Sequence, residues 1–454
     1  MKRKTLILTG LSLACVMTMS ACSKATTQTE VMKNKTESSM LLSYANIASA
    51  NYTDALNDAK LLKDAIEAFA SNPSEAALVN AKAAWLSSRE SYGTTEIFRL
   101  ANGPIDAEEG WVEQAYGALE GQLNAWPLDE NMIDYTINAK GERTSGNIID
   151  STGMFNPGGE ESTAVNITTI TEDSITALNE NGGDANVATG YHAIEFLLWG
   201  QDQDYSNFVK DSITNGAMVA GKRPLSDFTS DVNAPRRLAY LKAAAAKIVS
   251  DLTIVSSAWS KESSADCSID TKGCYRAALL SQLKGKDASK NINSIKATKT
   301  IFAGMGVFVK SELANERIAV AVLTPSEEDE HSCFSDNTHR DIAANYQGFK
   351  NVLLGTYKGV DYGIAPIDAV SKDDKVKLMA LMSKIEKKID SIDSIAKTSR
   401  HFDYQIQPND PQAKVIVKLK NELRKLGDEM VLVALANGIS LSVDDVTDVE
   451  ETKL

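Results

Sequence analysis

Apolar residues recur along most of the chain at steps of three and four positions. Four such stripes are Ala59, Leu62, Ile66 and Phe69; Leu78, Ala81 and Trp85; Leu378, Leu381, Ile385, Ile389 and Ile392; and Leu419, Leu423, Leu426, Met430 and Val433. This spacing places each stripe on one face of an amphipathic helix. The two-residue alternation of strands is rare. We therefore expect an all-α fold in which these stripes form the core.

Polar segments that contain Gly or Pro divide the helical pattern. The longest of them cover residues 140–162, 202–233 and 260–273. The chain beyond its N-terminal segment has roughly 410 residues, which is too long for one ordinary core. We expect a first helical bundle at 40–259, a connecting loop at 260–279, a second bundle at 280–445 and an acidic tail at 446–454. Antiparallel helices joined by short and long connections form up-and-down bundles.

The N-terminus has the order of features found in export signals. Positive residues at 2–4 precede an apolar run at 6–19, and small residues lead into Cys22. The run is shorter than the roughly 20 apolar residues that span a bilayer. Residues 19–22, Met-Ser-Ala-Cys, resemble a bacterial lipobox. The pattern predicts a signal peptide at 1–21 and lipidation of Cys22. The alternative is an ordinary cleaved signal that contains a cysteine.

A polar stretch at 22–39 cannot bury enough apolar surface to offset its ordering entropy, so it predicts a flexible tether. We therefore expect a lipid-anchored protein in the cell envelope of a Gram-negative bacterium. The outer membrane is favoured, with the protein on its periplasmic face or at the cell surface. The formal net charge of −14 argues against a nucleic-acid partner, because nucleic acids bind basic surfaces.

Three cysteines follow the N-terminal segment. Cys267 and Cys274 bracket a short polar loop, and export implies an oxidising compartment, so we expect a local disulfide between them. A reduced pair or a soft-metal site is the alternative. Cys333 has no partner in this pattern and is expected to be a small buried side chain.

His192 and Glu195 are the first candidates for chemistry. They are three residues apart, so on a helix they share one face and can bind one metal ion. The alternative is a hydrogen-bonded pair that steadies the helix. The chain has only four histidines, and His331 and His339 lie in an acidic segment at 327–341 that is rich in metal-ligand types. A solvated acidic loop is the alternative there.

The spacing Gly190-x-His192-x-x-Glu195, with its continuation to Asp202, resembles the signature of the imelysin (peptidase M75) family. Further stretches that are similar to the family are Trp85, Arg89, Tyr92 and 96–99, followed by 104–106; 120–128; and 311–317, which continues to 334–339. These stretches follow the family's order across most of the chain beyond the N-terminal segment.

The resemblance implies two pseudo-symmetric helical bundles with a site in the cleft between them. It also implies that His192 and Glu195 line this site. The metal-ligand set predicted in this way is His192, Glu195, Glu96, His339 and Asp336, with Asp106, Glu120, Arg89 and Asp202 as further cleft candidates.

The family includes proteins named as insulin-cleaving membrane peptidases, iron-regulated proteins and a domain of a ferrous-iron uptake component. The chain has no His-Glu-x-x-His pair and no identifiable catalytic base, so enzyme activity stays open. Mixed imidazole and carboxylate ligands suit iron, with zinc as the second choice. We therefore expect a divalent or ferric ion to bind, in a protein of iron acquisition whose partner is an envelope iron-uptake protein. The alternatives are an M75-type metallopeptidase and a metal-free carbohydrate- or protein-binding module.

Overall fold

The structure is a computed structural model that describes residues 12–138, 140–202, 217–263, 266–267, 271–323 and 330–448. Before Met40 it describes the helix backbone but not the side chains. The predicted lipidation site Cys22 therefore lies outside the residues whose side chains are described, and the predicted cleavage, tether and bundle boundaries stay predictions.

The class of the fold is all-α, as predicted. The first half of the chain forms α1 (Ser12–Ser71), α2 (Glu75–Gly93), η1 (Glu96–Phe98), α3 (Gly110–Tyr116), α4 (Glu120–Leu123), α5 (Glu130–Ile133), α6 (Glu172–Leu178), α7 (Gly190–Trp199), α8 (Ser226–Thr229) and α9 (Ala234–Ala258). The second half forms α10 (Cys274–Leu279), η2 (Gly285–Lys290), α11 (Ser294–Val307), η3 (Phe308–Ala319), α12 (Val320–Leu323), α13 (Thr338–Leu354), η4 (Pro366–Ala369), α14 (Lys372–Thr398), α15 (Phe402–Gln405), α16 (Ala413–Ala436) and η5 (Asp444–Val446).

The strands in the described residues belong to two short antiparallel hairpins. In the first, β1 (Met154–Phe155) pairs with β2 (Val165–Asn166), so that Met154 is opposite Asn166. In the second, β3 (Thr356–Tyr357) pairs with β4 (Val360–Asp361). The first hairpin lies in and beside the segment expected to be a loop at 140–162.

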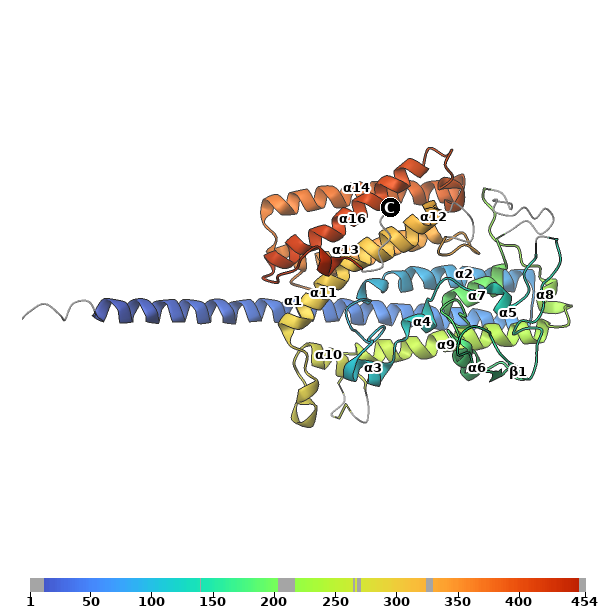
Figure 1. Cartoon of the computed structure of the whole chain (residues 1–454), viewed down its shortest axis with the longest axis horizontal. Coiled ribbons are helices and arrows are strands. Elements are labelled where there is room, and N and C mark those ends of the chain that lie inside the picture. The colour runs from blue at the N-terminus through green and yellow to red at the C-terminus, as the bar shows by residue number, and fades with distance from the viewer. Residues whose placement is uncertain are drawn as a thin grey trace, which may run out of the picture.

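The first group of long helices consists of α1, α2, α7 and α9. Helix α1 packs along both α2 and α9, and the short α7 packs between α2 and α9 (Figure 1). The predicted stripe that ends at Phe69 is fully buried in α1, and Trp85 is fully buried in α2. Ser74 fixes the start of α2, because its hydroxyl accepts a hydrogen bond from the Ala77 amide.

The second group consists of α11, η3, α13, α14 and α16. Figure 1 shows α14 and α16 along one side of the molecule and α9 on the opposite side, with α1 and α2 between them. The predicted stripes of α14 and α16 are buried, except that Leu381 is half-buried and Met382 takes its place in the core.

The two groups meet mainly where α2 packs against α13 and α1 packs against α11. The α2–α13 contact is close: a Cβ atom on Gly348 would lie 2.5 Å from the carbonyl oxygen of Thr94. The backbone of α13 can therefore approach the end of α2 only because residue 348 has no side chain. This contact positions the N-terminal end of α13 beside the first group.

Cys267 and Cys274 form the predicted disulfide, with a Cα–Cα distance of 5.8 Å. Cys333, the free cysteine among the described side chains, is buried as predicted. Within the described part of the chain, no helix combines the length and the hydrophobicity needed to cross a membrane.

Candidate metal centre

Helix α7 carries the predicted His192 and Glu195 and is buried on every side. Such a helix has no solvent face, so its polar side chains need partners inside the protein. Gly190 makes its first turn possible, because this residue has a φ of +86° and a Cβ would lie 2.6 Å from the carbonyl oxygen of Leu123. His192 is 1% exposed and Glu195 is fully buried.

Both oxygens of the Glu195 carboxyl group are engaged. Oε2 lies 2.8 Å from Nδ1 of His192. Oε1 accepts hydrogen bonds from the backbone amide of Ser335 at 3.0 Å and from its hydroxyl at 2.6 Å. Glu195 therefore orients the imidazole on its own helix and holds the segment that precedes α13.

A second imidazole is held in the same way. Nδ1 of His331 lies 2.8 Å from Oδ2 of Asp341, which also accepts a hydrogen bond from the Ser332 hydroxyl. The other oxygen of Asp341 accepts a hydrogen bond from Nη2 of Arg89 at 2.9 Å. Asp341 therefore orients His331 and also neutralises the buried Arg89.

The two imidazoles meet through their remaining nitrogens. Nε2 of His192 lies 3.3 Å from Nε2 of His331, and the two rings are nearly perpendicular, with an interplanar angle of 78°. We call His192 and His331 the histidine pair. In both residues a carboxyl group occupies Nδ1, which is how metal-binding histidines are commonly oriented from behind.

Burial shifts the pKa values of Glu195 and of both imidazoles of the histidine pair. It lowers the pKa of His192 well below its usual value and, together with the charge of Arg317, lowers the pKa of His331 to about 4. Burial raises the pKa of Glu195 to about 8, although the hydrogen bonds from Ser335 oppose this shift. Both rings are therefore neutral at pH 7, and Glu195 is mostly protonated.

Burial raises the pKa of Asp341, as it does for Glu195, but the neighbours of Asp341 lower this pKa by more. The charge of Arg89 and the hydrogen bonds from His331 and Ser332 lower the pKa of Asp341 well below its usual range. A protonated Glu195 can then donate to Nδ1 of His192, whose Nε2–H donates to His331. This order of protons makes each contact a hydrogen bond, with a neutral acid at one end and an ionised carboxylate at the other.

Arg89 separates the histidine pair from Glu96. Its guanidinium lies between 5.2 and 5.8 Å from the ring centres of Trp85, Tyr92 and Tyr191, so it is enclosed by aromatic faces. The guanidinium lies 3.9 Å from the Glu96 carboxylate, which also accepts a hydrogen bond from Arg317 at 2.9 Å. These contacts give the predicted ligand Glu96 two arginine partners.

A cavity of about 420 Å³ reaches Trp126, a neighbour of the histidine pair, although its described lining residues include neither histidine. Trp126 lines it and packs against His192, with 5.0 Å between the ring centres. The cavity is lined by residues of both helix groups and has five carboxyl groups but two arginines: Glu120, Glu180, Asp184, Glu312 and Glu316 with Arg99 and Arg317. An acidic cleft of this kind concentrates cations by its field.

A π-helix from the second half of the chain forms one wall of this cavity. Helix η3 continues α11 and carries Glu312, Glu316 and Arg317. Glu312 accepts a hydrogen bond from Arg99 of the first half at 3.1 Å. Segments of π-helix are uncommon and occur frequently at functional sites. The wider turn places two residues that are five apart, Glu312 and Arg317, within 3.6 Å of each other.

The other predicted site residues lie in three places. Asp336 and Asp202 come together with Asp403, in a group that contains neither histidine of the pair, and Nδ1 of His339 contacts the backbone oxygen of Asp336 at 3.0 Å. Asp106 accepts a hydrogen bond from the Leu100 amide. Glu120 lies 3.3 Å from Arg99 at the cavity. Their roles as metal ligands stay predictions.

His331 and Asp341 were not in the predicted ligand set. Both lie in the segment 327–341, where the density of ligand types pointed to a site, but the resemblance to the imelysin family favoured Asp336 and His339. The two residues are ten positions apart, with a loop between His331 and the first turn of α13. Because a loop gives no fixed periodicity, their spacing alone does not indicate that they meet.

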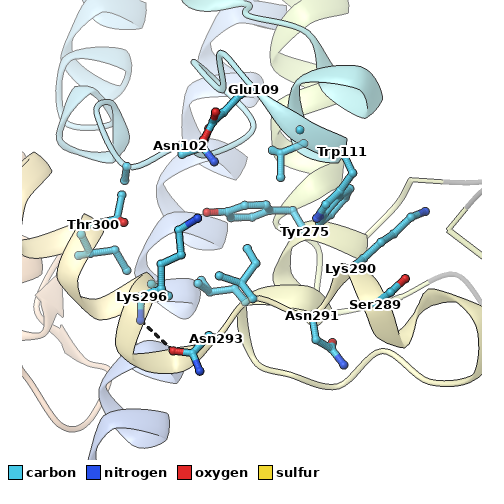
Figure 2. Close-up of a pocket in the computed structure, with 17 residues that line it drawn as sticks. Asn102, Glu109, Trp111, Tyr275, Ser289, Lys290, Asn291, Asn293, Lys296 and Thr300 are labelled. Carbon is cyan, nitrogen blue, oxygen red and sulfur yellow. Dashed lines mark hydrogen bonds between the residues drawn. The ribbon is translucent and has the colours of Figure 1, made fainter.

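A second cavity, of about 470 Å³, lies elsewhere between the two halves and is lined by Trp111, Tyr275, Lys290 and Lys296 (Figure 2). Figure 2 shows Tyr275 and Lys296 extending into it. Glu109 is its one carboxylate among the described lining residues, and no histidine lines it. This cavity therefore does not have the ligands that the sequence predicts for a metal site.

The fold and site define an all-α protein with a buried histidine pair at the contact between two groups of helices. The sequence profile of the imelysin family, Peptidase_M75, matches residues 48–430, and the chain belongs to this family. Among solved structures, it is similar to an iron-regulated protein A precursor from Parabacteroides distasonis, with 16% identity and a TM-score of 0.57. That match covers 89% of this chain and 95% of the other. No curated protein matches the chain.

Proposed function

We propose that this imelysin-family protein is a cell-envelope lipoprotein that binds an iron ion at the histidine pair and acts in iron acquisition. One observation carries the proposal: both Nδ1 atoms are held by carboxyl groups, and the two Nε2 atoms face each other at 3.3 Å. When Glu195 loses its proton, both rings can direct an Nε2 lone pair into the same gap. A cation relieves the resulting repulsion.

The donor set and its spacing fit a metal ion. Imidazole nitrogens bind first-row metals at about 2.0–2.1 Å. Two nitrogens 3.3 Å apart would then subtend an angle of roughly 107° at the ion, close to the tetrahedral value. His192 and His331 would hold the ion, and Glu195 and Asp341 would orient the two rings. Imidazole ligands suit ferrous iron and also zinc, which is the alternative cargo.

The acidic cavity supports a cation as the cargo. Its five carboxyl groups outnumber its two arginines, and it extends to Trp126, which lies against the ring of His192. A cation that enters from solvent would therefore be attracted along the cavity wall toward the histidine pair. The similarity to a protein named as iron-regulated supports iron as the ion.

The envelope location is the second part of the proposal. The sequence at 1–39 supports it, because its charged start, apolar run, Met-Ser-Ala-Cys at 19–22 and polar stretch resemble the signal, lipobox and tether of an exported lipoprotein. A tethered iron binder would deliver its ion to an envelope iron-uptake protein. Mass spectrometry of the N-terminal peptide tests the anchor: a diacylglycerol-modified Cys22 supports it, and an unmodified cysteine contradicts it.

Titration calorimetry of the full-length chain in detergent tests the metal site. Ferrous iron under anaerobic conditions, ferric citrate and zinc would each be titrated into the parent chain and into His192→Ala and His331→Ala variants. We expect one ion per chain, lost in both variants. His339→Ala is the matched control, because His339 contacts the Asp336 backbone rather than the histidine pair. Retained binding in His331→Ala, or loss only in His339→Ala, would place the ion elsewhere.

A further inference from the structure

Three carboxylates from different elements of the fold gather at one place. Asp202 follows α7, Asp336 precedes α13, and Asp403 belongs to α15. One oxygen from each lies within 4.8 Å of the other two, and all three residues are at least nine-tenths buried. We call these residues the carboxylate cluster. Buried like charges repel each other strongly, so a cluster of this kind needs compensation.

Glu330 is an independent sign that something is bound there. It is 1% exposed, and no described residue donates a hydrogen bond to either of its carboxyl oxygens. Burial raises the pKa of Glu330, and the charges of Asp403, Asp336 and Asp202 raise it further, so the three aspartates are among its neighbours. Oδ1 of Asp403 also lacks a hydrogen bond from the described residues. Buried oxygens in this state are uncommon in native proteins unless water or an ion satisfies them.

We propose that Asp202, Glu330, Asp336 and Asp403 form an oxygen-only site for a calcium ion, separate from the iron site. Four carboxyl groups without a nitrogen or sulfur ligand suit a hard cation. One oxygen from each of the three aspartates lies within 4.8 Å of the other two, so a single ion can reach all three. Calcium accepts six to eight oxygen ligands in a flexible geometry, whereas magnesium needs a nearly ideal octahedron, so carboxyl groups from several separate elements suit calcium better.

The calcium ion would join the two halves of the chain. Asp202 comes from the first half, and the other three ligands come from the second. The basic group His401 stands beside the cluster and donates from Nδ1 to Asp336. Glu330 and Asp336 also bound the segment that carries His331 and Ser335, so the ion would fix this segment against the end of α7. The proposed role is therefore structural, and it does not require iron to bind.

The test uses the full-length chain in detergent after treatment with a chelator. Equilibrium dialysis with radioactive calcium measures the stoichiometry and affinity for the parent chain and for Glu330→Gln and Asp403→Asn. We expect one calcium ion per chain and at least ~10-fold weaker binding in each variant, because each loses a charged ligand. Asp410→Asn is the matched control, since Asp410 pairs with Arg400 outside the cluster.

Two further measurements keep the outcome clear. Calcium should raise the unfolding temperature of the parent chain but not of Glu330→Gln, whose calcium-free form should itself unfold at a higher temperature than the calcium-free parent. His192→Ala should bind calcium normally, which separates this site from the proposed iron site. The proposal is overturned if the parent chain binds no calcium, if the two variants bind it unchanged, or if magnesium binds in preference.

Discussion

Nε2 of His192 lies 3.3 Å from Nε2 of His331, although the two residues are 139 positions apart. Each ring is held from behind by a carboxyl group on its own half of the chain, Glu195 for one and Asp341 for the other. The gap between the rings therefore exists only when the two groups of helices are docked. Any ligand in this gap stabilises the docked arrangement.

The two orienting carboxyl groups should behave differently when they are made neutral. Glu195→Gln resembles the protonated acid, so we expect little change in stability but a 10- to 100-fold loss of metal affinity. Asp341→Asn should lower affinity similarly and also destabilise the protein by about 3 kcal/mol, because the buried Arg89 loses its closest charge partner and keeps only Glu96, 3.9 Å away. Calorimetry and urea unfolding measure the two quantities. Equal stability losses in the two variants would contradict this assignment.

Trp126 should report occupation of the histidine pair. Its ring centre lies 5.0 Å from that of His192, so a bound iron ion should quench its fluorescence. We expect ferrous iron to lower the emission of the parent chain, and Trp126→Phe to remove most of this decrease. Trp111→Phe is the control, because Trp111 lines the other cavity. The same quenching in the Trp126→Phe variant would show that the ion binds near another tryptophan.

Acid should weaken the first helix group through Asp134. Burial would raise the pKa of this carboxyl, but Arg223 and Arg237 lower it below its usual value. A folded-state pKa below the unfolded value stabilises the protein above about pH 4, and this stabilisation is lost as the pH falls through the folded pKa. Asp134→Asn should cost about 3–5 kcal/mol at pH 7.

Urea unfolding between pH 2 and pH 7 measures this effect. The Asp134→Asn variant should lose less stability on acidification than the parent chain does. Asp390→Asn, on the exposed face of α14, is the control and should leave the unfolding midpoint at pH 7 unchanged. A parent-like pH profile in Asp134→Asn would rule out this ion-pair group as an acid-sensitive element.

The Cys267–Cys274 disulfide should contribute modestly to stability. The cysteines are seven positions apart, and closing so short a loop restricts the unfolded chain by about 2.5 kcal/mol. Replacing both cysteines with serine should lower the free energy of unfolding by about that amount and leave metal binding intact. Mass spectrometry after alkylation checks the bond: one reactive thiol, Cys333, should appear in the unfolded, unreduced chain beyond the N-terminal segment.

Local patterns predicted much of the fold and half of the histidine pair. The stripes of α1, α2, α14 and α16 repeat within a few turns, so the sequence alone shows which faces are buried. His192 and Glu195 share one helix, and their spacing fixes their contact. His331 comes from a loop, and its position depends on the docking of α13 against α2 through Gly348. No local periodicity in the sequence indicates the contact between α13 and α2.

The π-helix and the separation of Asp336 from the histidine pair were also beyond the sequence pattern. The apolar pattern of the chain predicted only that most of it is helical, whereas the i→i+5 hydrogen bonding of η3 is a property of its backbone. Asp336 adopts a left-handed backbone conformation, with a φ of +57°. The turn at Asp336 separates this residue from its neighbour Ser335, which contacts Glu195, whereas Asp336 joins the carboxylate cluster. The number of possible ligands in a segment does not predict such a division.

Residues 330–337 contribute to both of the proposed ion sites. His331 and Ser335 of this segment serve the histidine pair and Glu195, and Glu330 and Asp336 serve the carboxylate cluster. If calcium raises the affinity for iron by ordering this segment, iron must raise the affinity for calcium by the same factor, because the coupling free energy belongs to both ions. The protein would then retain its cargo in calcium-rich surroundings and release it more readily where calcium is scarce.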